Sequence, residues 1–212
     1  MNLEEGLELL GVEAAAGTLE RFDAYLRALS KSNKAFNLVS RKSQDEALTR
    51  HLLDSLSIMS SLNGDRLLDV GTGAGLPGLI AAIAAPNVHC TLLDSNGKKA
   101  RFCYQTAADL GLDNVTVVNE RLDAFESDIP FTTVVSRAFG PAADLVACTR
   151  RLCEAEGRII CMKGTRPTDE LEALGSMKEN ARIVKVDVPG LDAERHLLIV
   201  DLAKGKSAET AA

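Results

Sequence analysis

The spacing of apolar residues along the chain changes near residue 63. Before that point, four apolar residues recur at helical spacing: Leu19, Phe22, Leu26 and Leu29. This spacing predicts a helix with Thr18 as its N-cap, and a second helix is predicted over about residues 43–61. After that point, short apolar runs typical of strands alternate with helical segments as far as residue 202.

The second part of the chain predicts a doubly wound α/β sheet, Rossmann-like and mostly parallel, with helices on both faces. Seven runs are predicted as strands: 67–70, 88–93, 115–118, 132–135, 159–162, 183–188 and 196–202. Four segments between them are predicted as helices: 79–85, 98–110, 141–153 and 168–174. The last two strands are separated by too little chain for a parallel crossover, so we expect them to form an antiparallel hairpin.

No linker rich in glycine or proline separates the two parts, so the N-terminal helices are expected to pack on the sheet domain. We divide the chain into an N-terminal helical extension (1–62), an α/β domain (63–204) and a frayed tail (205–212). No stretch approaches the roughly 20 apolar residues that span a bilayer, and the first residues do not resemble a secretory signal. We therefore expect a cytoplasmic protein without a membrane segment, and we expect it to be a monomer.

Composition argues against metal and disulfide chemistry. The five cysteines form no CxxC pair, and most have apolar neighbours, so we expect them to be reduced and structural: Cys90, Cys103, Cys148, Cys153 and Cys161. The three histidines are too scattered to suggest a metal site. The net charge of −6 argues weakly against nonspecific binding to nucleic acid. Residues 27–50 nevertheless hold six basic side chains against two acids, which allows a local basic face.

The strongest motif is a buried strand that runs into a glycine-rich turn at residues 69–78 (DVGTGAGLPG). Glycines such as Gly71 and Gly73 permit sharp backbone geometry and let a ligand lie against bare main chain. In open α/β sheets, ligands bind at the carboxyl ends of the strands, where this turn lies. A tight turn without a ligand is the structural alternative.

The end of the turn, residues 73–78, also matches GxGxxG, so a dinucleotide ligand must be considered. Asp69 favours S-adenosylmethionine instead, because a carboxylate suits the positively charged methionine end and would repel a pyrophosphate. Asp94 ends the next strand, where an acid grips a ribose diol in both cofactor classes. It could alternatively cap the following helix, although Ser95 and Asn96 are also suited to that role. Asp123, after the third strand, could meet the adenine edge.

Together these residues resemble the bacterial 16S rRNA guanine-N7 methyltransferase family, also called the glucose-inhibited division protein B family. The resemblance extends over nearly the whole chain and is carried by these segments: 33–38 (NKAFNL), 50–55 (RHLLDS), 69–78, 92–95 (LLDS), 97–99 (GKK), 135–139 (VSRAF), 163–164 (KG) and 194–197 (ERHL). The chain departs from the family at Ser32, where a tryptophan is usual, and at Thr132 and Thr133, where an aspartate is usual.

The resemblance implies a class I S-adenosylmethionine-dependent methyltransferase fold with N-terminal helices. It also implies methyl transfer to N7 of guanosine 527 in 16S rRNA of the small ribosomal subunit. Carried over by position, five residues are expected to contact the methyl donor: Gly71, Leu76, Leu122, Asp123 and Arg137. Three cations are expected to face RNA or the target base: Arg121, Lys163 and Arg195.

Guanine N7 already carries an unshared electron pair, so the reaction needs correct positioning and neither a protein nucleophile nor a base. The sequence agrees, since it lacks the [DN]PP[YF] segment of amino methylases and has no cysteine directly after a proline. Arginine and lysine can bind the acceptor atoms of guanine, although surface salt bridges are the alternative role for Arg137, Lys163 and Arg195.

Three other functions stay open at this point. A small-molecule methyltransferase would need an enclosed aromatic pocket, which eight aromatic residues and no tryptophan supply poorly. An NAD-dependent dehydrogenase would need a catalytic histidine or a Tyr-Lys pair, and His196 in a predicted strand is a poor candidate. A noncatalytic module that holds the donor during ribosome assembly would be distinguished by its lack of turnover on RNA.

Overall fold

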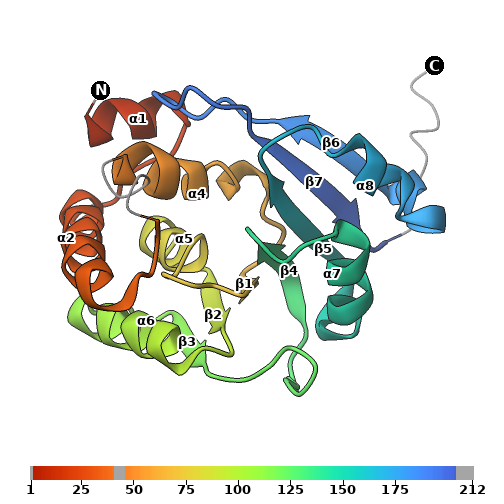
Figure 1. Ribbon diagram of the computed structural model, residues 1–212, viewed down its shortest axis with the longest axis horizontal. Helices are drawn as coiled ribbons and strands as arrows, with labels where there is room; N and C mark the ends of the chain where they lie inside the picture. Colours follow the sequence, from red (N-terminus) through yellow and green to blue (C-terminus); the bar gives the residue numbers. More distant parts are fainter. Residues whose placement is uncertain (1, 41–45, 204–212) are drawn as a thin grey trace.

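A single seven-stranded sheet, in the order β3-β2-β1-β4-β5-β7-β6, forms the centre of the molecule (Figure 1). This computed structural model describes residues 2–40 and 46–203. The strands are β1 (Arg66–Val70), β2 (His89–Leu93), β3 (Val115–Val118), β4 (Phe131–Ser136), β5 (Cys153–Lys163), β6 (Ala181–Lys185) and β7 (His196–Asp201). The first five strands pair in parallel, while β7 is antiparallel to both β5 and β6. The mostly parallel sheet and its terminal hairpin are thus confirmed.

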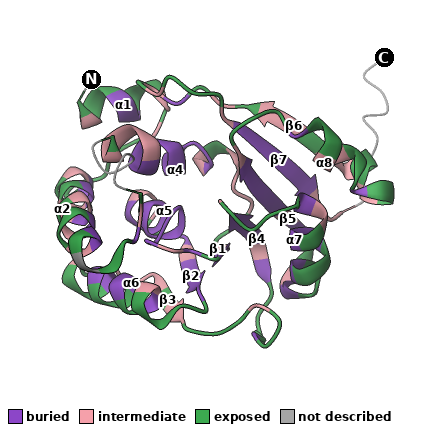
Figure 2. Ribbon diagram, viewed as in Figure 1, coloured by how far each residue is buried: buried purple, intermediate pink, exposed green. Residues whose placement is uncertain are grey.

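Helices cover both faces of this sheet (Figure 1). They are α1 (Leu3–Leu9), α2 (Thr18–Phe36), α4 (Asp54–Leu56), α5 (Gly78–Ala84), α6 (Gly97–Asp109), α7 (Ala142–Thr149) and α8 (Thr168–Glu172). Strand β7 is buried on both faces, as Figure 2 shows, since Leu197 and Ile199 join one apolar cluster while Leu198 and Val200 join another. A strand that is buried on both faces accordingly appears in the sequence as a continuous apolar run.

The second predicted helix is helical where it is described, but it is not one regular α-helix. It consists of a π-helical turn, η1 (Leu48–Leu53), then α4, then a 3-10 turn, η2 (Met59–Ser61). Residues 43–45 of the predicted span lie outside the described residues. The prediction of Thr18 as N-cap is wrong, because Gly17 holds that place with φ 80° and Thr18 is the first helical residue. Glycine adopts that left-handed conformation without steric cost.

The N-terminal helices share one apolar core with the sheet. Phe22 and Tyr25 of α2, together with Leu52 and Leu53 of η1, are fully buried in the cluster that also contains residues of the strands. The extension therefore packs on the sheet domain, while the boundary at residue 62 stays a prediction and the tail (205–212) lies outside the described residues.

The structure shows the state of the five cysteines. All five are free, and three of them are buried: Cys90, Cys103 and Cys161. No helix in the described parts of the chain is both long and apolar enough to cross a membrane. At Thr132 and Thr133 the sequence departs from the pattern of the family that it resembles. The hydroxyl groups of these two residues bind backbone groups of Arg66 and Asn63 and so hold the start of β1 in place.

Truncation of Phe22 tests whether the extension belongs to the same folding unit as the sheet. Its side chain is fully buried, so Phe22→Ala should lower the free energy of unfolding by about 3–5 kcal/mol in one cooperative transition. Leu9→Ala is the matched control, because Leu9 is 71% exposed and its truncation should cost less than about 0.5 kcal/mol. A separate transition for the extension, followed by chemical denaturation, would contradict this expectation.

Candidate functional site

The loop after β1 crosses the carboxyl end of the sheet with its backbone exposed to a cleft. Gly71, Gly73 and Gly75 have φ values of 69°, 60° and 80°, a conformation that residues with a side chain rarely adopt. A Cβ built on Gly71 would meet nothing within 4 Å, whereas one on Gly75 would lie 2.3 Å from Leu79. Gly71 therefore leaves bare backbone beside open space, and Gly75 permits close packing of the loop on α5.

Asp69 lies beneath this loop and is completely buried. One carboxylate oxygen, Oδ2, accepts hydrogen bonds from the Thr72 hydroxyl (2.6 Å) and the Gly78 backbone N–H (2.8 Å). The other oxygen, Oδ1, has no hydrogen-bond partner within the described residues. Burial raises the pKa of Asp69 to about 6, although the bonds from Thr72 and Gly78 oppose that shift. The carboxylate holds the loop from below, and direct contact with the donor stays a prediction.

Asp94 connects the ends of β1 and β2. Its Oδ2 accepts a hydrogen bond from the Gly73 backbone N–H (2.9 Å), and its Oδ1 accepts one from the Asn96 N–H (2.8 Å). Each carboxylate oxygen has a second lone pair, so Asp94 can still accept hydroxyl groups from a ligand. The cap of α6 is Asn96, which accepts bonds from Lys98 N and Lys99 N. Asn96, and not Asp94, therefore caps α6.

Asp94 lies at the wall of a cleft of about 350 Å³, here called the donor cleft, which is the size of a small-molecule site. Its lining residues are Val70, Gly71, Leu93, Asp94, Ser95, Glu120, Arg121, Leu122, Asp123, Phe139 and Cys148. The structure thus brings together four of the residues that were predicted to bind the donor: Gly71, Asp94, Leu122 and Asp123. Arg121, which was predicted to face RNA or the target base, also lines this cleft, in an exposed ion pair with Asp123.

Leu76 does not line the donor cleft. Its side chain is 1% exposed and packs in the apolar core, so contact with a donor would have to involve its backbone. The loop is also held from the N-terminal extension, because the buried Tyr25 hydroxyl donates a hydrogen bond to the Ala74 carbonyl (2.8 Å). The extension therefore helps to shape the loop that faces the donor cleft.

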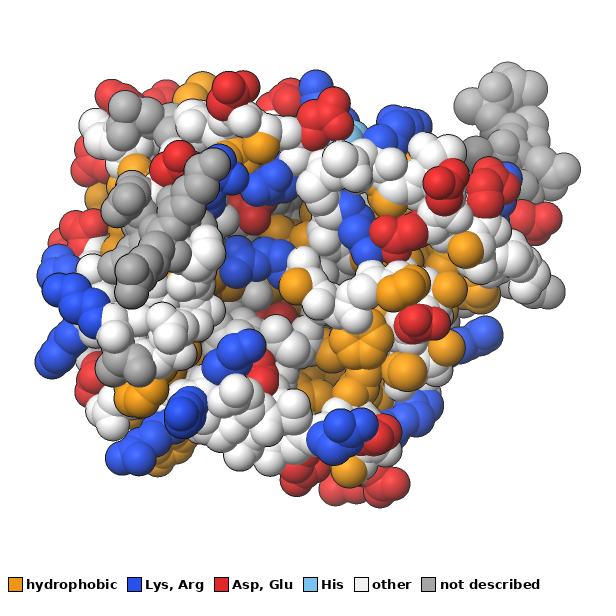
Figure 3. All heavy atoms as spheres, in the orientation of Figure 1, with side chains coloured by type: hydrophobic (Ala, Val, Ile, Leu, Met, Phe, Trp, Pro, Cys, Tyr) orange, Lys and Arg blue, Asp and Glu red, His pale blue; other side chains and the backbone are white. Residues whose placement is uncertain are grey.

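A second cleft, here called the cationic cleft, has a volume of about 330 Å³. It is lined by Arg50, His51, Asp54, Ser57, Arg137, Met162, Lys163, Gly164, Arg195, His196 and Leu197. Figure 3 shows Lys and Arg side chains gathered around a hollow near the middle of this face, with an apolar area beside it. Residues from the extension, β5, β7 and the loop after β4 meet here, although they are far apart in sequence.

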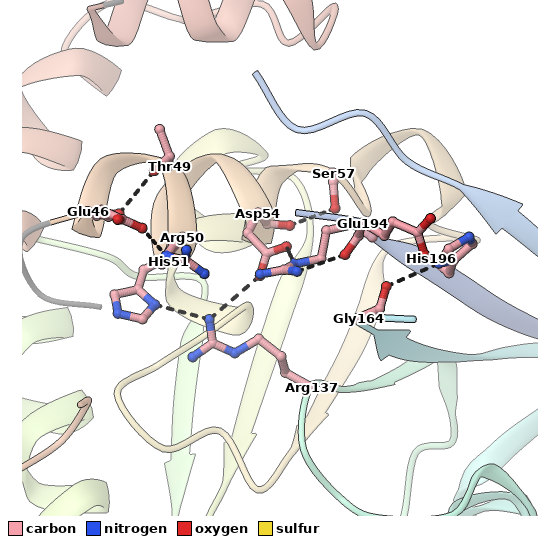
Figure 4. A network of polar contacts seen from close by, with 11 residues as sticks. Glu46, Thr49, Arg50, His51, Asp54, Ser57, Arg137, Gly164, Glu194 and His196 are labelled. Carbon is pink, nitrogen blue, oxygen red and sulfur yellow. Dashed lines mark hydrogen bonds and ion pairs between the residues drawn. The ribbon is translucent and has the colours of Figure 1, made fainter. Parts of the chain in front are cut away.

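Arg137 and Arg195, both in the cationic cleft, share the carboxylate of Asp54. Figure 4 labels Arg137 and Asp54. Arg195 donates from Nε to Asp54 Oδ1 at 2.7 Å, and Arg137 Nη1 lies 3.9 Å from Asp54 Oδ2. Burial raises the pKa of Asp54, while Arg195 and Arg137 act in the opposite direction. Arg137, which was predicted to bind the donor, thus belongs with Arg195 in the cationic cleft.

His51 is a neutral neighbour of Arg137. Its Nδ1 accepts a hydrogen bond from Arg137 Nη1 at 3.4 Å, so the ring proton lies on Nε2 (Figure 4). Burial, and then the charge of Arg137, lowers the pKa of His51 to about 4. His51 is therefore uncharged at neutral pH and supports Arg137 as a hydrogen-bond acceptor.

Lys163 and His196, which line the cationic cleft, each bind a backbone carbonyl nearby. Lys163 Nζ donates to the Gly140 carbonyl (2.6 Å) and forms an ion pair with Glu170 (2.7 Å). His196 Nδ1 donates to the Gly164 carbonyl (3.1 Å). Both residues thus have structural contacts besides any role toward a ligand.

The loop after β4 lies between the two clefts. Phe139 lines the donor cleft and also a smaller cavity of about 290 Å³, which Arg137 and Lys163 share with the cationic cleft. A ligand in the donor cleft and another in the cationic cleft would therefore meet at this loop. Such an arrangement suits group transfer between two bound molecules.

The sequence analysis did not identify several residues of these clefts as functional. Asp54 and Ser57 of the cationic cleft, and Phe139 and Cys148 of the donor cleft, were not predicted. A signal existed for Asp54, since Arg50 and Asp54 are four residues apart and so can share one helix face. No group of three or more possible metal ligands occurs within the described ranges.

Comparison with known proteins gives consistent matches. The sequence model of the family described as "rRNA small subunit methyltransferase G" matches residues 18–198. Two similar curated proteins carry the name ribosomal RNA small subunit methyltransferase G. The protein from Nitrosococcus oceani is 46% identical over 92% of both chains, and the one from Alkalilimnicola ehrlichii is 47% identical over 92% of this chain and 89% of its own.

Solved structures resemble the fold. A SAM-dependent methyltransferase from Aquifex aeolicus superposes with a TM-score of 0.55, covering 81% of this chain and 98% of its own, at 15% sequence identity. Similarity at this level of identity concerns the fold alone. The architecture is thus the class I S-adenosylmethionine-dependent methyltransferase fold, with N-terminal helices added.

Replacement of Asp69 by asparagine tests the buried charge beneath the loop. The pKa of Asp69 is about 6 in the folded chain, whereas the ordinary pKa of 3.8 is expected in the unfolded chain. Between these values the unfolded state loses the proton first, so the free energy of unfolding of the wild type falls as pH rises. The free energy of unfolding of Asp69→Asn minus that of the wild type should therefore rise by roughly 2–3 kcal/mol from pH 4 to 6, then level off.

Denaturant unfolding at a series of pH values measures this difference. Asp128→Asn, which changes a carboxylate exposed in a loop, is the matched control and should show no such rise. A difference that stays flat or falls over the same interval would contradict the buried-charge assignment.

Proposed function

We propose, since the chain belongs to the rRNA small subunit methyltransferase G family, that it methylates N7 of one guanine, guanosine 527, in 16S rRNA. S-adenosylmethionine is the methyl donor, in keeping with the family and the fold. One observation carries the finer proposal. The loop after β4 lies between a cleft suited to the donor and a cleft lined by four basic side chains: Arg50, Arg137, Lys163 and Arg195.

The donor cleft fits S-adenosylmethionine in its chemistry. The bare backbone of Gly71 allows close approach of a ligand, and Asp94 has lone pairs available for two ribose hydroxyls. Leu122 and Phe139 offer apolar surface to a purine, beside the Asp123 carboxylate. When bound, the donor supplies an electrophilic methyl group on a sulfonium.

The acceptor atom requires no proton transfer, which matches the side chains of the cationic cleft. Guanine N7 carries a free lone pair, so a general base would have no task. His51 accepts a hydrogen bond from Arg137, and the Nδ1–H of His196 is bound to the Gly164 carbonyl. These histidines hold neighbouring groups in place, and neither is needed as a base.

The cations must bind guanine without blocking the atom that reacts. Arginine commonly donates to both O6 and N7 of guanine. A donor to N7 would occupy the lone pair that forms the new bond. We therefore assign Arg137, Lys163 and Arg195 to O6 and to phosphate oxygens, while N7 faces the donor cleft.

The charge distribution favours a folded RNA target. The chain has a net charge of −6, so general attraction to phosphates is weak and recognition must depend on local basic groups meeting a shaped surface. We accordingly place the substrate in an assembled or partly assembled small ribosomal subunit, with the enzyme acting as a cytoplasmic monomer. A small-molecule acceptor is less compatible, because charged side chains line the acceptor side and aromatic residues do not.

Small ribosomal subunits that lack the modification provide the direct test. Incubation with donor labelled in its methyl group, followed by nuclease digestion and mapping, should place the label on N7 of one guanine of 16S rRNA. A short oligonucleotide of the same sequence should accept little label. Label on another base, on another atom or on no RNA would refute the proposal, and binding of donor without turnover would indicate a noncatalytic module.

Two substitutions should separate the two clefts. Arg195→Ala removes a charge-assisted contact worth about 1.5–3 kcal/mol, so kcat/KM for ribosomal subunits should fall by about tenfold to a hundredfold. Its affinity for S-adenosylhomocysteine, measured by calorimetry, should stay within about twofold. Asp94→Ala should instead lower the affinity for S-adenosylhomocysteine by about tenfold or more.

Arg182→Ala is the matched control, since Arg182 also forms an ion pair with an aspartate of β7, Asp201, yet does not line the cationic cleft. It should leave both affinity and kcat/KM near wild-type values. Loss of donor affinity in Arg195→Ala, or unchanged transfer, would contradict the assignment of the clefts.

A further inference from the structure

Asp54 is an acid in the middle of a cleft that otherwise collects cations. Its side chain is 5% exposed and belongs to the N-terminal extension, whereas Arg137 follows β4 and Arg195 precedes β7. Burial of a carboxylate is costly unless it is paired, and both guanidinium groups lie within 4 Å of it (Figure 4). Three separate parts of the chain are thus joined through one negative charge.

The other cations of the cleft have their own acids. Arg50 is paired with Glu46, and Lys163 is paired with Glu170. Arg137 and Arg195 share Asp54 alone among the described residues, so the ion pairs of this cleft contain four cations and three carboxylates. The cleft therefore keeps one net positive charge, and loss of Asp54 would leave two.

This balance matters for the chemistry of the proposed function. The lone pair of guanine N7 forms the new N–CH₃ bond, the electron pair of the broken S–CH₃ bond stays on sulfur, and no proton moves. The positive charge consequently leaves the sulfur and appears on the purine, which would lie beside Arg137 and Arg195. Cations that help to bind the neutral guanine and its phosphates would repel the guanine base once it becomes cationic.

We propose that Asp54 is a positioning residue that lies between Arg137 and Arg195 and offsets their charge as the target guanine becomes cationic. The inference rests on the proposed N7 transfer. Arg195 is held through its Nε by Asp54 and through Nη1 by the Glu194 carbonyl. Both contacts of Arg137 within the described residues use Nη1, which leaves Nη2 and Nε for a ligand.

Asp54→Asn tests this role, because it removes the charge and keeps an oxygen that can accept from Arg195. The single-turnover rate at saturating donor and ribosomal subunits should fall at least tenfold. Affinity for subunits, measured by filter binding, should stay equal or become tighter, since the cleft gains net positive charge. Affinity for S-adenosylhomocysteine should stay within about twofold. A merely structural role would instead lower subunit affinity together with the rate.

The double variant Asp54→Asn with Arg195→Gln restores the original net charge of the cleft. Because Asp54 is replaced as well, the loss of Arg195 leaves no buried carboxylate without its partner. The double variant should bind subunits more weakly than wild type, yet its saturating single-turnover rate should exceed that of Asp54→Asn at least threefold. Thermal melting checks the fold of both variants. If Asp54→Asn does not fold, the double variant is compared with Arg195→Gln and should be slower, since only Arg195→Gln keeps a carboxylate beside Arg137. A rate for Asp54→Asn near the wild-type value, or a double variant no faster than Asp54→Asn and no slower than Arg195→Gln, would overturn the inference.

Wild-type enzyme assayed in parallel keeps this test separate from the test of the proposed function. If the wild type forms no N7-methylguanine, the proposed function fails and so does the inference that depends on it. If the wild type methylates N7 and the variants show either overturning result, only the role of Asp54 fails.

Discussion

Hydrogen bonds between two buried aspartates and the backbone of one glycine loop determine the geometry of the donor cleft. Asp69 binds the end of the loop at Gly78, and Asp94 binds its middle at Gly73. Backbone N–H groups in a loop without regular structure need partners, and a carboxylate supplies a strong one. The cost is a buried charge, seen in the raised pKa of Asp69. The loop can therefore be free of side chains on its ligand side and still hold one conformation.

The N-terminal extension contributes to both clefts. Tyr25 reaches the glycine loop through the Ala74 carbonyl, while His51 and Asp54 hold the arginines of the cationic cleft. Tyr25 and the apolar neighbours of His51 and Asp54, among them Leu52 and Leu53, lie in the same apolar core as Phe22. The position of each polar group therefore depends on the packing of the extension against the sheet. Chemistry in this fold thus depends on a segment outside the usual nucleotide-binding strands.

Local pairing of charges reconciles an acidic protein with an RNA substrate. The chain carries an excess of acids, yet basic side chains converge at the carboxyl ends of β4 and β5 and the amino end of β7. Each is held by a carboxylate or a backbone carbonyl, as Lys163 is by Glu170 and Gly140. Fixed side chains lose less conformational entropy on binding, so a small number of cations can recognise one shaped target selectively.

The sequence alone determined the sheet, its terminal hairpin and the glycine loop, because apolar periodicity and glycine spacing are local properties of the chain. From the motifs and the family resemblance, it also predicted that Gly71, Asp94, Leu122 and Asp123 belong to one site. They line one cleft because the strands that they follow end at one edge of the sheet. Only the tertiary structure decided that Arg121 lies beside the donor cleft and Arg137 beside Asp54. It also decided that the helix before β1 changes from a π-helical turn to an α-helical and then a 3-10 turn. Contacts between residues as distant as Asp54 and Arg195 arise from packing of the extension on the sheet, and spacing along the chain carries no record of them.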